Sequence, residues 1–260
     1  MLKGKTAIVT GSTSGIGLGI ASALAAEGCG VMLNGFGDRA AIERLRAGLA
    51  EKHGVRVAYS PADMSKPAEI RELVADTVRQ FGGVDTLVNN AGIQHVAKLV
   101  DFSEEHWDAV IAINLSAAFH ATKAVLTYMI ARKWGRIINI ASAHGLVASG
   151  EKAAYVAAKH GLVGLTKVTA IETANQGVTC NAICPGWVLT PLVQQQIEAR
   201  AKAQGIPVEQ AREDLVREKQ PMLDYTTTEK IGAFAVFLCG EAASTITGAA
   251  LSIDGGWIAQ

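Results

Sequence analysis

Short apolar runs rich in β-branched residues alternate along the chain with longer stretches of helical periodicity. The first run is TAIVT at residues 6–10, and residues 15–28 then show helical spacing and end at Gly28. Later runs are VMLN, VRVAYS, VDTLVNNAG, GRIINIAS, GVTCNAICPG and GAALSIDGG. Strands and helices that alternate in this rhythm build a parallel sheet with right-handed crossovers. The sequence therefore predicts an α/β fold with a doubly wound parallel sheet.

The helical stretches between these runs have recognisable ends. Residues 40–54 form an amphipathic segment that stops at Gly54, and residues 66–83 open with Pro67 near the first turn and close with two glycines. Proline at the start and glycine past the end are typical of helices. Longer helical stretches are expected at roughly 104–133 and 153–175.

A single domain is expected over residues 1–260, because this length suits one large α/β domain. One segment breaks the alternation: residues 190–225 are polar and helix-rich and follow the sixth strand. An insertion at the carboxyl end of a parallel strand lies beside the ligand crevice. We interpret it as a lid over a substrate; the alternative is a pair of solvated helices.

Composition excludes several partner classes. The formal net charge is 0, so a global attraction to nucleic acid or to an anionic membrane is not expected. The opening residues lack the apolar run of a signal peptide. Four cysteines are scattered in apolar surroundings, and the C-x3-C pair has no second ligand pair for zinc. We expect buried reduced thiols, no metal site and a cytoplasmic protein. The cysteines are Cys29, Cys180, Cys184 and Cys239.

The segment TGSTSGIG (10–17) stands where the first strand meets the first helix. Gly11, Gly15 and Gly17 have the spacing G-x3-G-x-G. Glycines at such a turn allow the backbone to approach a pyrophosphate, and the helix amino terminus that follows attracts its charge. A glycine trio alone is weak evidence, but at this place in an alternating chain it predicts a Rossmann-type dinucleotide site.

The residues after the second strand favour NAD over NADP. NAD sites usually place an acid there, whereas NADP sites place arginine or lysine nearby. The position where NAD sites usually have an acidic residue falls near Gly35, and no acidic residue stands there. Phe36 follows and can cover the adenine. Arg39 is the one basic residue nearby. The three residues after Gly11 carry no positive charge. We therefore expect NAD, since a 2′-phosphate would lack a counter-charge.

Two further strand ends are expected to contact the dinucleotide. Asp63 in ADMS follows the third strand and is placed to bond the adenine amino group, and NNAG (89–92) ends the fourth strand beside the adenine ribose. The cofactor contacts expected from these segments are Gly11, Thr13, Ser14, Gly15, Ile16, Gly17, Phe36, Asp63, Met64, Asn90, Ala91 and Gly92.

Ser142, Tyr155 and Lys159 form a candidate catalytic group. The spacing of four places Tyr155 and Lys159 on one helix face. Free tyrosine has a pKa of about 10, and a neighbouring ammonium favours the phenolate and lowers that pKa. Ser142 would hold the substrate oxygen while Tyr155 takes its proton. We expect proton abstraction coupled to hydride transfer.

The motifs TGSTSGIG, NNAG, INLSA, YVAAK and PGWVLT occur in the order typical of short-chain dehydrogenases/reductases, and the chain resembles that family over its whole length. The resemblance implies that Asn114 lies in a helix distortion and holds a water linked to Lys159. It implies cofactor contacts from Tyr155 and Lys159 and hydride transfer at the pro-S face. It also implies a homotetramer built on the helices within 104–133 and 153–175. Further cofactor contacts that it implies are Pro185, Gly186, Val188 and Thr190.

Residues beside the catalytic group face the substrate in this family. A pocket with one ammonium, one imidazole and two amides suits a small carboxylate, which charge-assisted hydrogen bonds would orient. Alternatives remain: the histidine can bond a backbone carbonyl, the lysine and the lid glutamine can be solvated, and the tryptophans can be ordinary packing. The candidate substrate residues are Gln94, His144, Lys152, Trp187, Gln196 and Trp257.

Within the family, NAGIQH, SAHGLVASGEKAAYVAAKHG, CPGWVLTPLVQQQI and DGGW resemble the members that interconvert (R)-3-hydroxybutyrate and acetoacetate with NAD. That resemblance implies that Gln94, His144, Lys152 and Gln196 hold the carboxylate. The alternatives are a 3-oxoacyl carrier-protein reductase that uses NADPH, and a nucleotide-sensing protein without catalysis.

Overall fold

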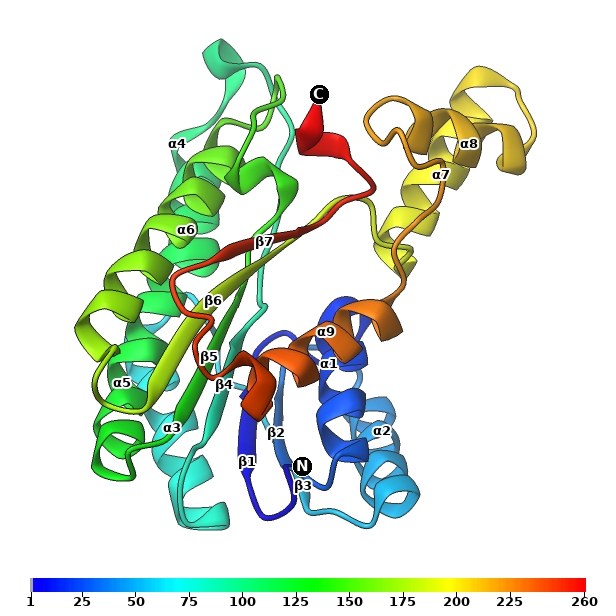
Figure 1. The fold of residues 1–260 in the computed structure, drawn as a ribbon. Helices are drawn as coiled ribbons and strands as arrows, with labels where there is room; N and C mark the ends of the chain where they lie inside the picture. The colour runs from blue at the N-terminus through cyan, green and yellow to red at the C-terminus, as the bar shows by residue number, and fades with distance from the viewer. Residues whose placement is uncertain (1) are drawn as a thin grey trace.

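A seven-stranded parallel sheet forms the centre of the molecule, with the strand order β3-β2-β1-β4-β5-β6-β7 (Figure 1). The computed structural model describes residues 2–260. Every neighbouring pair of strands is parallel, and the order reverses between β1 and β4, so the predicted doubly wound sheet is confirmed. The strands are β1 Thr6–Val9, β2 Gly30–Asn34, β3 Val57–Ser60, β4 Thr86–Asn89, β5 Gly135–Ile140, β6 Val178–Pro185 and β7 Ala250–Ile253.

Helices cover both faces of the sheet (Figure 1). On one face lie α1 (Gly15–Ala26), α2 (Arg39–His53) and α9 (Thr228–Cys239). On the other lie α3 (Pro67–Phe81), α4 (Glu104–Ile111), α5 (Ala117–Ala131) and α6 (Ala153–Thr173).

Alternate residues of the central strands supply the two halves of the core. Val9 and Leu33 are buried with α1 and α9, whereas their neighbours Ile8 and Met32 are buried with α3 and α5. Successive side chains of a strand point to opposite faces, so strands covered on both sides read as continuous apolar runs. This packing explains why these strands show no polar alternation.

The helix ends agree with the signals in the sequence. The carboxylate of Asp38 accepts a hydrogen bond from the Ala41 amide at the start of α2, and the helix ends at Gly54 with a φ of 63°. Helix α3 begins at Pro67 and is followed by Gly82 with a φ of 82°. Both glycines have the left-handed backbone that side chains disfavour.

The long helical stretch predicted at 104–133 is interrupted. A π-helical turn, Ala112–Ser116, separates α4 from α5 and contains Asn114, so the helix distortion implied for that residue is confirmed. By length and composition alone, the stretch Glu104–Ala131 is apolar enough to cross a membrane. Here its inner side packs against α3 and α6, with Val110, Val125 and Met129 fully buried.

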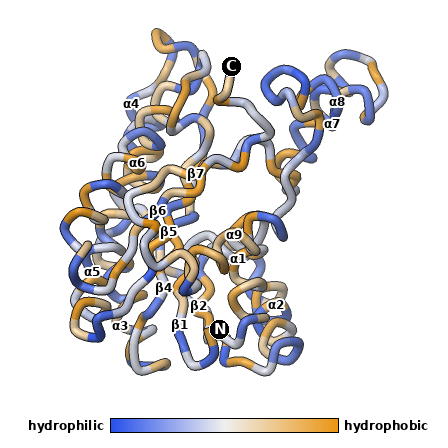
Figure 2. Tube along the Cα trace, in the orientation of Figure 1, coloured by the Kyte–Doolittle hydropathy of each residue, from blue (hydrophilic) through white to orange (hydrophobic). Residues whose placement is uncertain are grey.

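The insertion after β6 forms two helices, α7 (Pro191–Gln204) and α8 (Val208–Arg217), which extend away from the rest of the molecule (Figure 1). The pair has a small apolar core of its own that includes Ile197, Ala211 and Tyr225, while hydrophilic residues colour much of its trace (Figure 2). The two ends of the insertion are joined, because the Thr226 amide donates to the Trp187 carbonyl. The insertion is therefore a helical pair with its own apolar core, and its two ends lie side by side where it joins the rest of the chain.

Candidate active site

Two adjoining hollows lie at the carboxyl ends of the strands, where the strand order reverses. The larger has a volume of about 400 Å³ and follows the loops after β1, β2, β3 and β4. The smaller has a volume of about 180 Å³ and lies beneath the insertion. Ile16, Thr190 and Leu192 line both, so a molecule in the first can meet one in the second. Ligands of open α/β sheets bind at such a position.

The loop between β1 and α1 can hold a pyrophosphate. A Cβ on Gly17 would collide with the Gly11 carbonyl oxygen and the Asn90 side chain, so only glycine permits this approach. Helix α1 has no acidic residue in its first turn, and the Ser14 side chain makes no capping hydrogen bond. The free amides at this helix end therefore remain available to an anion.

Asn90 has a role that sequence reasoning missed. Its amide nitrogen donates to the carbonyl oxygens of Thr10 and Gly11, each at 2.9 Å, and its backbone amide donates to the Thr10 hydroxyl. The side chain thus ties the loop after β4 to the loop after β1. We expected it beside the ribose; it lines the groove, but its amide is used to fix the phosphate loop.

The loop after β2 has no room for an acidic side chain at Gly35. A Cβ there would lie 2.7 Å from the Thr13 hydroxyl, and the φ of 148° favours glycine. Phe36 is 66% exposed and lines the groove. Asp63 lines it too, and hydrogen bonds from Ser65 lower the pKa of its carboxyl, so it stays an ionised acceptor.

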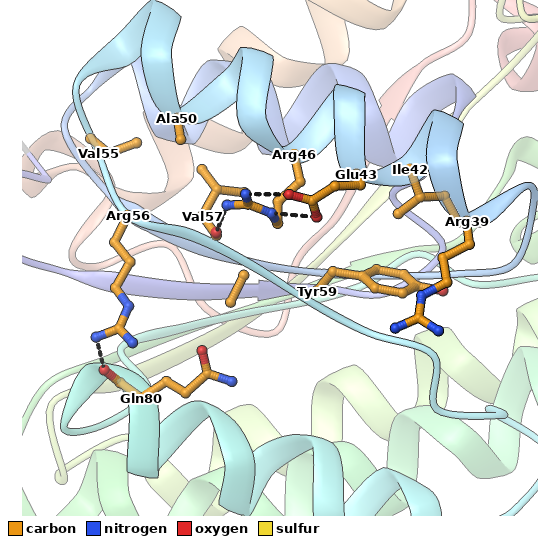
Figure 3. A pocket seen from close by; sticks show the side chains of 11 residues that line it. Arg39, Ile42, Glu43, Arg46, Ala50, Val55, Arg56, Val57, Tyr59 and Gln80 are labelled. Carbon is orange, nitrogen blue, oxygen red and sulfur yellow. Dashed lines mark hydrogen bonds and ion pairs between the residues drawn. The ribbon is translucent and has the colours of Figure 1, made fainter.

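A hollow larger than these two, about 660 Å³, lies elsewhere, between α2 and β3 (Figure 3). Arg46 there bonds both carboxylate oxygens of Glu43 and the Val57 carbonyl oxygen. Arg39 lies beside Tyr59 and does not line the dinucleotide groove. This hollow contains none of the candidate catalytic residues, and its arginines cover the edge strand β3.

The smaller hollow brings the candidate catalytic and substrate residues together. Ser142 and Tyr155 line it. So do all six side chains expected to contact a substrate: Gln94, His144, Lys152, Trp187, Gln196 and Trp257. Tyr155 comes from α6 and Ser142 from the turn after β5, while Gln196 comes from α7, so three distant segments build one pocket.

Lys159 lies behind Tyr155. Its side chain is buried, its Nζ donates to the Ile140 carbonyl oxygen at 2.7 Å, and the same atom is 5.5 Å from the centre of the Tyr155 ring. Burial lowers the pKa of Lys159 to about 8. Lys159 therefore still carries its positive charge for most of the time at pH 7, in a site that offers the charge little solvation.

The expected direction of the Tyr155 pKa is wrong. Burial raises the pKa of Tyr155 above its ordinary value, and the hydrogen bond with Ser142 only opposes this in part. Lys159 adds no lowering that offsets this effect of burial. The spacing of Tyr155 and Lys159 predicts that they are neighbours, but it does not predict how deeply Tyr155 is buried. That burial decides whether the pKa of Tyr155 is raised or lowered. The positive charge of an oxidised nicotinamide, when bound, would act in the direction of the phenolate.

Asn114 fixes the loop that carries Gln94. Its amide nitrogen donates to the Ile93 carbonyl oxygen and its amide oxygen accepts from the Ile93 amide, both at 2.9 Å. The side chain is buried, so these bonds are protected from water. The water contact that the resemblance implies would therefore have to use the main chain of Asn114, which the π-helical turn rearranges.

His144 and Lys152 are both partly desolvated, although in different ways. The His144 Nε2 lies 2.9 Å from the Ser149 hydroxyl, so its partner is a side chain rather than the backbone carbonyl considered from the sequence. The Lys152 Nζ lies 5.8 Å from the centre of the Trp187 ring, and no carboxylate within residues 2–260 forms an ion pair with it. An unpaired, half-buried ammonium facing a pocket is a site for an anion.

The chain is similar to known proteins over its whole length. A family model described as enoyl-(acyl carrier protein) reductase matches residues 11–258. The chain is 62% identical, over 100% of both chains, to a D-beta-hydroxybutyrate dehydrogenase of Cupriavidus necator. It is 51% identical to a protein with the same description from Rhizobium meliloti, over 98% of this chain and 99% of that one. This chain is a short-chain dehydrogenase/reductase. Members of this family use NAD or NADP.

Solved structures of short-chain dehydrogenases/reductases superimpose on the whole chain. An L-sorbose reductase of Gluconobacter frateurii with NADPH and L-sorbose has a TM-score of 0.95 and 30% identity, over 100% of this chain and 98% of that one. An actinorhodin polyketide ketoreductase variant with NADPH has a TM-score of 0.92 and 35% identity over 100% of both chains. The fold is therefore that of the family.

The structure places the sequence-predicted cofactor residues of this short-chain dehydrogenase/reductase in different positions. Gly186, Val188 and Tyr155 line the smaller hollow. Gly17 packs against the phosphate loop, whereas Pro185 and Lys159 line neither hollow. The others line the groove: Gly11, Thr13, Ser14, Gly15, Ile16, Phe36, Asp63, Met64, Asn90, Ala91, Gly92 and Thr190.

Sequence reasoning missed two residues beside the substrate pocket. Gln220 is buried; its side-chain oxygen accepts from the Trp187 amide and its nitrogen donates to the Asp224 carbonyl oxygen. It therefore anchors the pocket wall to the far end of the insertion. Lys219 is near enough to lower the pKa values of both His144 and Lys152. Neither Gln220 nor Lys219 belongs to a motif. They come close to the pocket only because the chain folds back to it after α8.

Proposed function

We propose that this protein interconverts (R)-3-hydroxybutyrate and acetoacetate with NAD. The observation that carries the proposal is the small pocket in which the unpaired ammonium of Lys152 faces Ser142 and Tyr155. The descriptions of the relatives from Cupriavidus necator and Rhizobium meliloti support the same substrate.

The size of the pocket favours a short acid. Its volume of about 180 Å³ lies below the roughly 300–1,000 Å³ typical of sites for drug-sized ligands. The rings of Trp187 and Trp257 lie 6.0 Å apart and form one wall, and His144 meets Trp257 edge-on at 5.0 Å. A long acyl chain would have to displace these rings, so a four-carbon acid is the better fit.

The residues divide the reaction between them. Lys152, His144, Gln94 and Gln196 hold the carboxylate, and this places the 3-hydroxyl against Ser142 and Tyr155. Tyr155 takes the hydroxyl proton, while Ser142 stabilises the oxygen that becomes the ketone. NAD, when bound, accepts the hydride from carbon 3. Closure of α7 and α8 brings Gln196 to the acid and excludes water.

The lining of the groove supports NAD rather than NADP. Arginine and lysine are missing from the described residues that line it, and its one charged lining residue is Asp63. A 2′-phosphate would therefore meet an acid without a compensating cation. Although Arg39 follows the loop after β2, it lines the separate hollow beneath α2.

A homotetramer and a cytoplasmic location complete the proposal. Exposed apolar side chains on α5 and α6 include Phe119, Val168 and Ile171, and contact with other copies would remove them from water. The four cysteines are free and buried, which suits a reducing compartment.

A second candidate is a ketoacyl reductase that uses NADPH. It is favoured by 39% identity to a protein described as a granaticin polyketide synthase putative ketoacyl reductase from Streptomyces violaceoruber, and by the NADPH in the similar structures. The ammonium of Lys152 and the tryptophan wall argue against it, because a thioester carries no charge for Lys152 to bind.

Replacing Lys152 with alanine is expected to raise the KM for 3-hydroxybutyrate roughly ten- to a hundredfold, with a much smaller change in kcat. Hydrogen bonds to charged groups contribute about 1.5–3 kcal/mol, and this one is made equally before and during hydride transfer. Steady-state rates measured by NADH absorbance test this. Lys52→Ala on the exposed face of α2 is the control.

The uncharged 3-hydroxybutyramide makes the Lys152 test specific. The unmodified protein should discriminate strongly between acid and amide, and Lys152→Ala should lose most of that discrimination. An unchanged KM for the acid, or unchanged discrimination, would show that Lys152 does not bind the carboxylate.

A further inference from the structure

The imidazole of His144 is held rigidly at the wall of the substrate pocket. The residue is only 4% exposed, and its ring meets Trp257 edge-on at 5.0 Å and Tyr155 edge-on at 6.0 Å. Its Nε2 lies 2.9 Å from the Ser149 hydroxyl. The backbone amide of the same residue donates to the Ser142 oxygen at 3.1 Å. His144 therefore stands between the catalytic hydroxyl and the proposed carboxylate site.

His144 is a neutral imidazole near pH 7. Burial, followed by the charges of Lys152, Lys219 and His160, lowers its pKa to about 4. A neutral ring carries one N–H, so one nitrogen donates and the other accepts. The tautomer therefore decides what the ring offers a ligand.

The other ring nitrogen, Nδ1, is left open to a ligand. It has no hydrogen-bond partner among the described residues, and it is absent from the buried polar atoms of residues 2–260 that lack a partner. Nδ1 therefore keeps some contact with solvent, and His144 itself lines the hollow. It is the atom that a bound carboxylate would meet.

The two tautomers have opposite consequences for that carboxylate. If Nε2 carries the proton, it donates to Ser149, and the lone pair of Nδ1 faces the anion and repels it. If the Ser149 hydroxyl donates to Nε2, the proton resides on Nδ1 and is offered to the anion. The serine hydroxyl can play either part, because it both donates and accepts.

We propose that Ser149 is a positioning residue that donates its hydroxyl proton to Nε2 of His144 and thereby makes Nδ1 an uncharged donor to the substrate carboxylate. The inference rests on the proposed function, because it takes a carboxylate as the ligand. Ser149 and Lys152 belong to one short loop, so this loop supplies both an ammonium and the partner that sets the neutral donor.

The arrangement has a consequence for pH dependence. The His144 ring contacts Ser149, Tyr155 and Trp257. The nearby groups whose charge opposes its protonation are Lys152, Lys219 and His160. Because His144 stays neutral above a pH of about 4, its contribution to carboxylate binding does not fall as pH rises from 5 to 8. An imidazolium with an ordinary pKa of about 6.5 would lose its charge within that range.

Long-range ¹H–¹⁵N correlation spectra of the cofactor-free protein test the tautomer directly. The expected result at neutral pH is a protonated Nδ1 and an unprotonated Nε2 for His144, assigned by comparison with a His144→Gln variant. In Ser149→Ala we expect the two tautomers to mix, whereas Ser149→Thr, which keeps a hydroxyl, should retain the tautomer of the unmodified protein.

Kinetics provide the second readout. Ser149→Ala is expected to raise the KM for (R)-3-hydroxybutyrate about tenfold with little change in kcat, in line with the loss of one hydrogen bond to a charged group, and Ser149→Thr should restore it. Ser103→Ala is the matched control, because Ser103 also pairs with a histidine, His106, at 2.6 Å outside the pocket.

A protonated Nε2 in the unmodified protein would overturn the inference, and so would an unchanged KM in Ser149→Ala. The proposed function fails separately: if the unmodified protein oxidises no 3-hydroxybutyrate, the substrate is wrong, whereas the spectra still decide the tautomer.

Discussion

Replacing Tyr155 with phenylalanine is expected to reduce kcat by roughly 10²–10⁴-fold, the range typical of a lost general acid or base, while NAD still binds. The change removes one hydroxyl and keeps the ring that meets His144 edge-on and lies beside the Lys159 ammonium. Ser142 still polarises the substrate oxygen, but its neutral hydroxyl is a poor proton acceptor. The proton then lacks an acceptor when the hydride leaves.

Two measurements decide the Tyr155→Phe prediction: kcat at saturating acid and NAD, and the affinity for NAD by titration calorimetry. Tyr128→Phe on the outer side of α5 is the matched control, with kcat unchanged. Because burial raises the Tyr155 pKa, kcat/KM of the unmodified protein should increase with pH above neutrality, and the variant should lose this dependence. A kcat within tenfold of the unmodified value would remove Tyr155 from the mechanism.

Replacing Lys159 with methionine is expected to abolish most turnover and, at neutral pH, to raise the free energy of unfolding by roughly 1–3 kcal/mol. The pKa of Lys159 falls from 10.5 to about 8 because the ammonium is buried. A tenfold change in a protonation equilibrium corresponds to about 1.4 kcal/mol, so the charged group destabilises the fold by roughly 3 kcal/mol before its bond to the Ile140 carbonyl is counted.

The sign of the Lys159 effect follows from linkage. The unfolded chain binds this proton more tightly than the folded one, so the penalty is complete below a pH of about 8 and disappears as pH rises past 10.5. Urea denaturation of both proteins at several pH values should show a gain in stability that shrinks from pH 8 upward. A variant that is less stable at pH 7, or equally stable at every pH, would contradict this account.

The fold class was predictable because a chain that alternates buried strands with amphipathic helices is compatible with few folds other than a parallel α/β sheet. The consecutive apolar residues Ala7–Val9 of β1 and Ile137–Ile138 of β5 fit strands that are covered on both faces. Helix ends at Gly54 and Gly82 were marked because left-handed backbone favours glycine. The π-helical turn within 104–133 was expected from family resemblance, since no local signal distinguishes it from a continuous helix.

Site residues that directly follow a strand could be predicted from the sequence. Site residues that the fold brings in from a distant part of the chain could not. Ser142 and Lys152 flank one strand–helix junction, so spacing alone brings them together. Gln220 and Ser149 act through hydrogen bonds to Trp187 and His144, and no pattern marks such partners. The Tyr155 pKa was predicted with the wrong sign because the extent of burial depends on the whole fold.

Reduction of nicotinamide by a matched set of substrates tests the central claim most directly. Purified protein is mixed with (R)- or (S)-3-hydroxybutyrate and with NAD or NADP, and the absorbance of the reduced nicotinamide is followed. We predict rapid reduction with the (R) acid and NAD, and little with the other three combinations. Reduction in none of the four, together with NADPH oxidation by a 3-oxoacyl thioester, would contradict the account and favour a ketoacyl reductase.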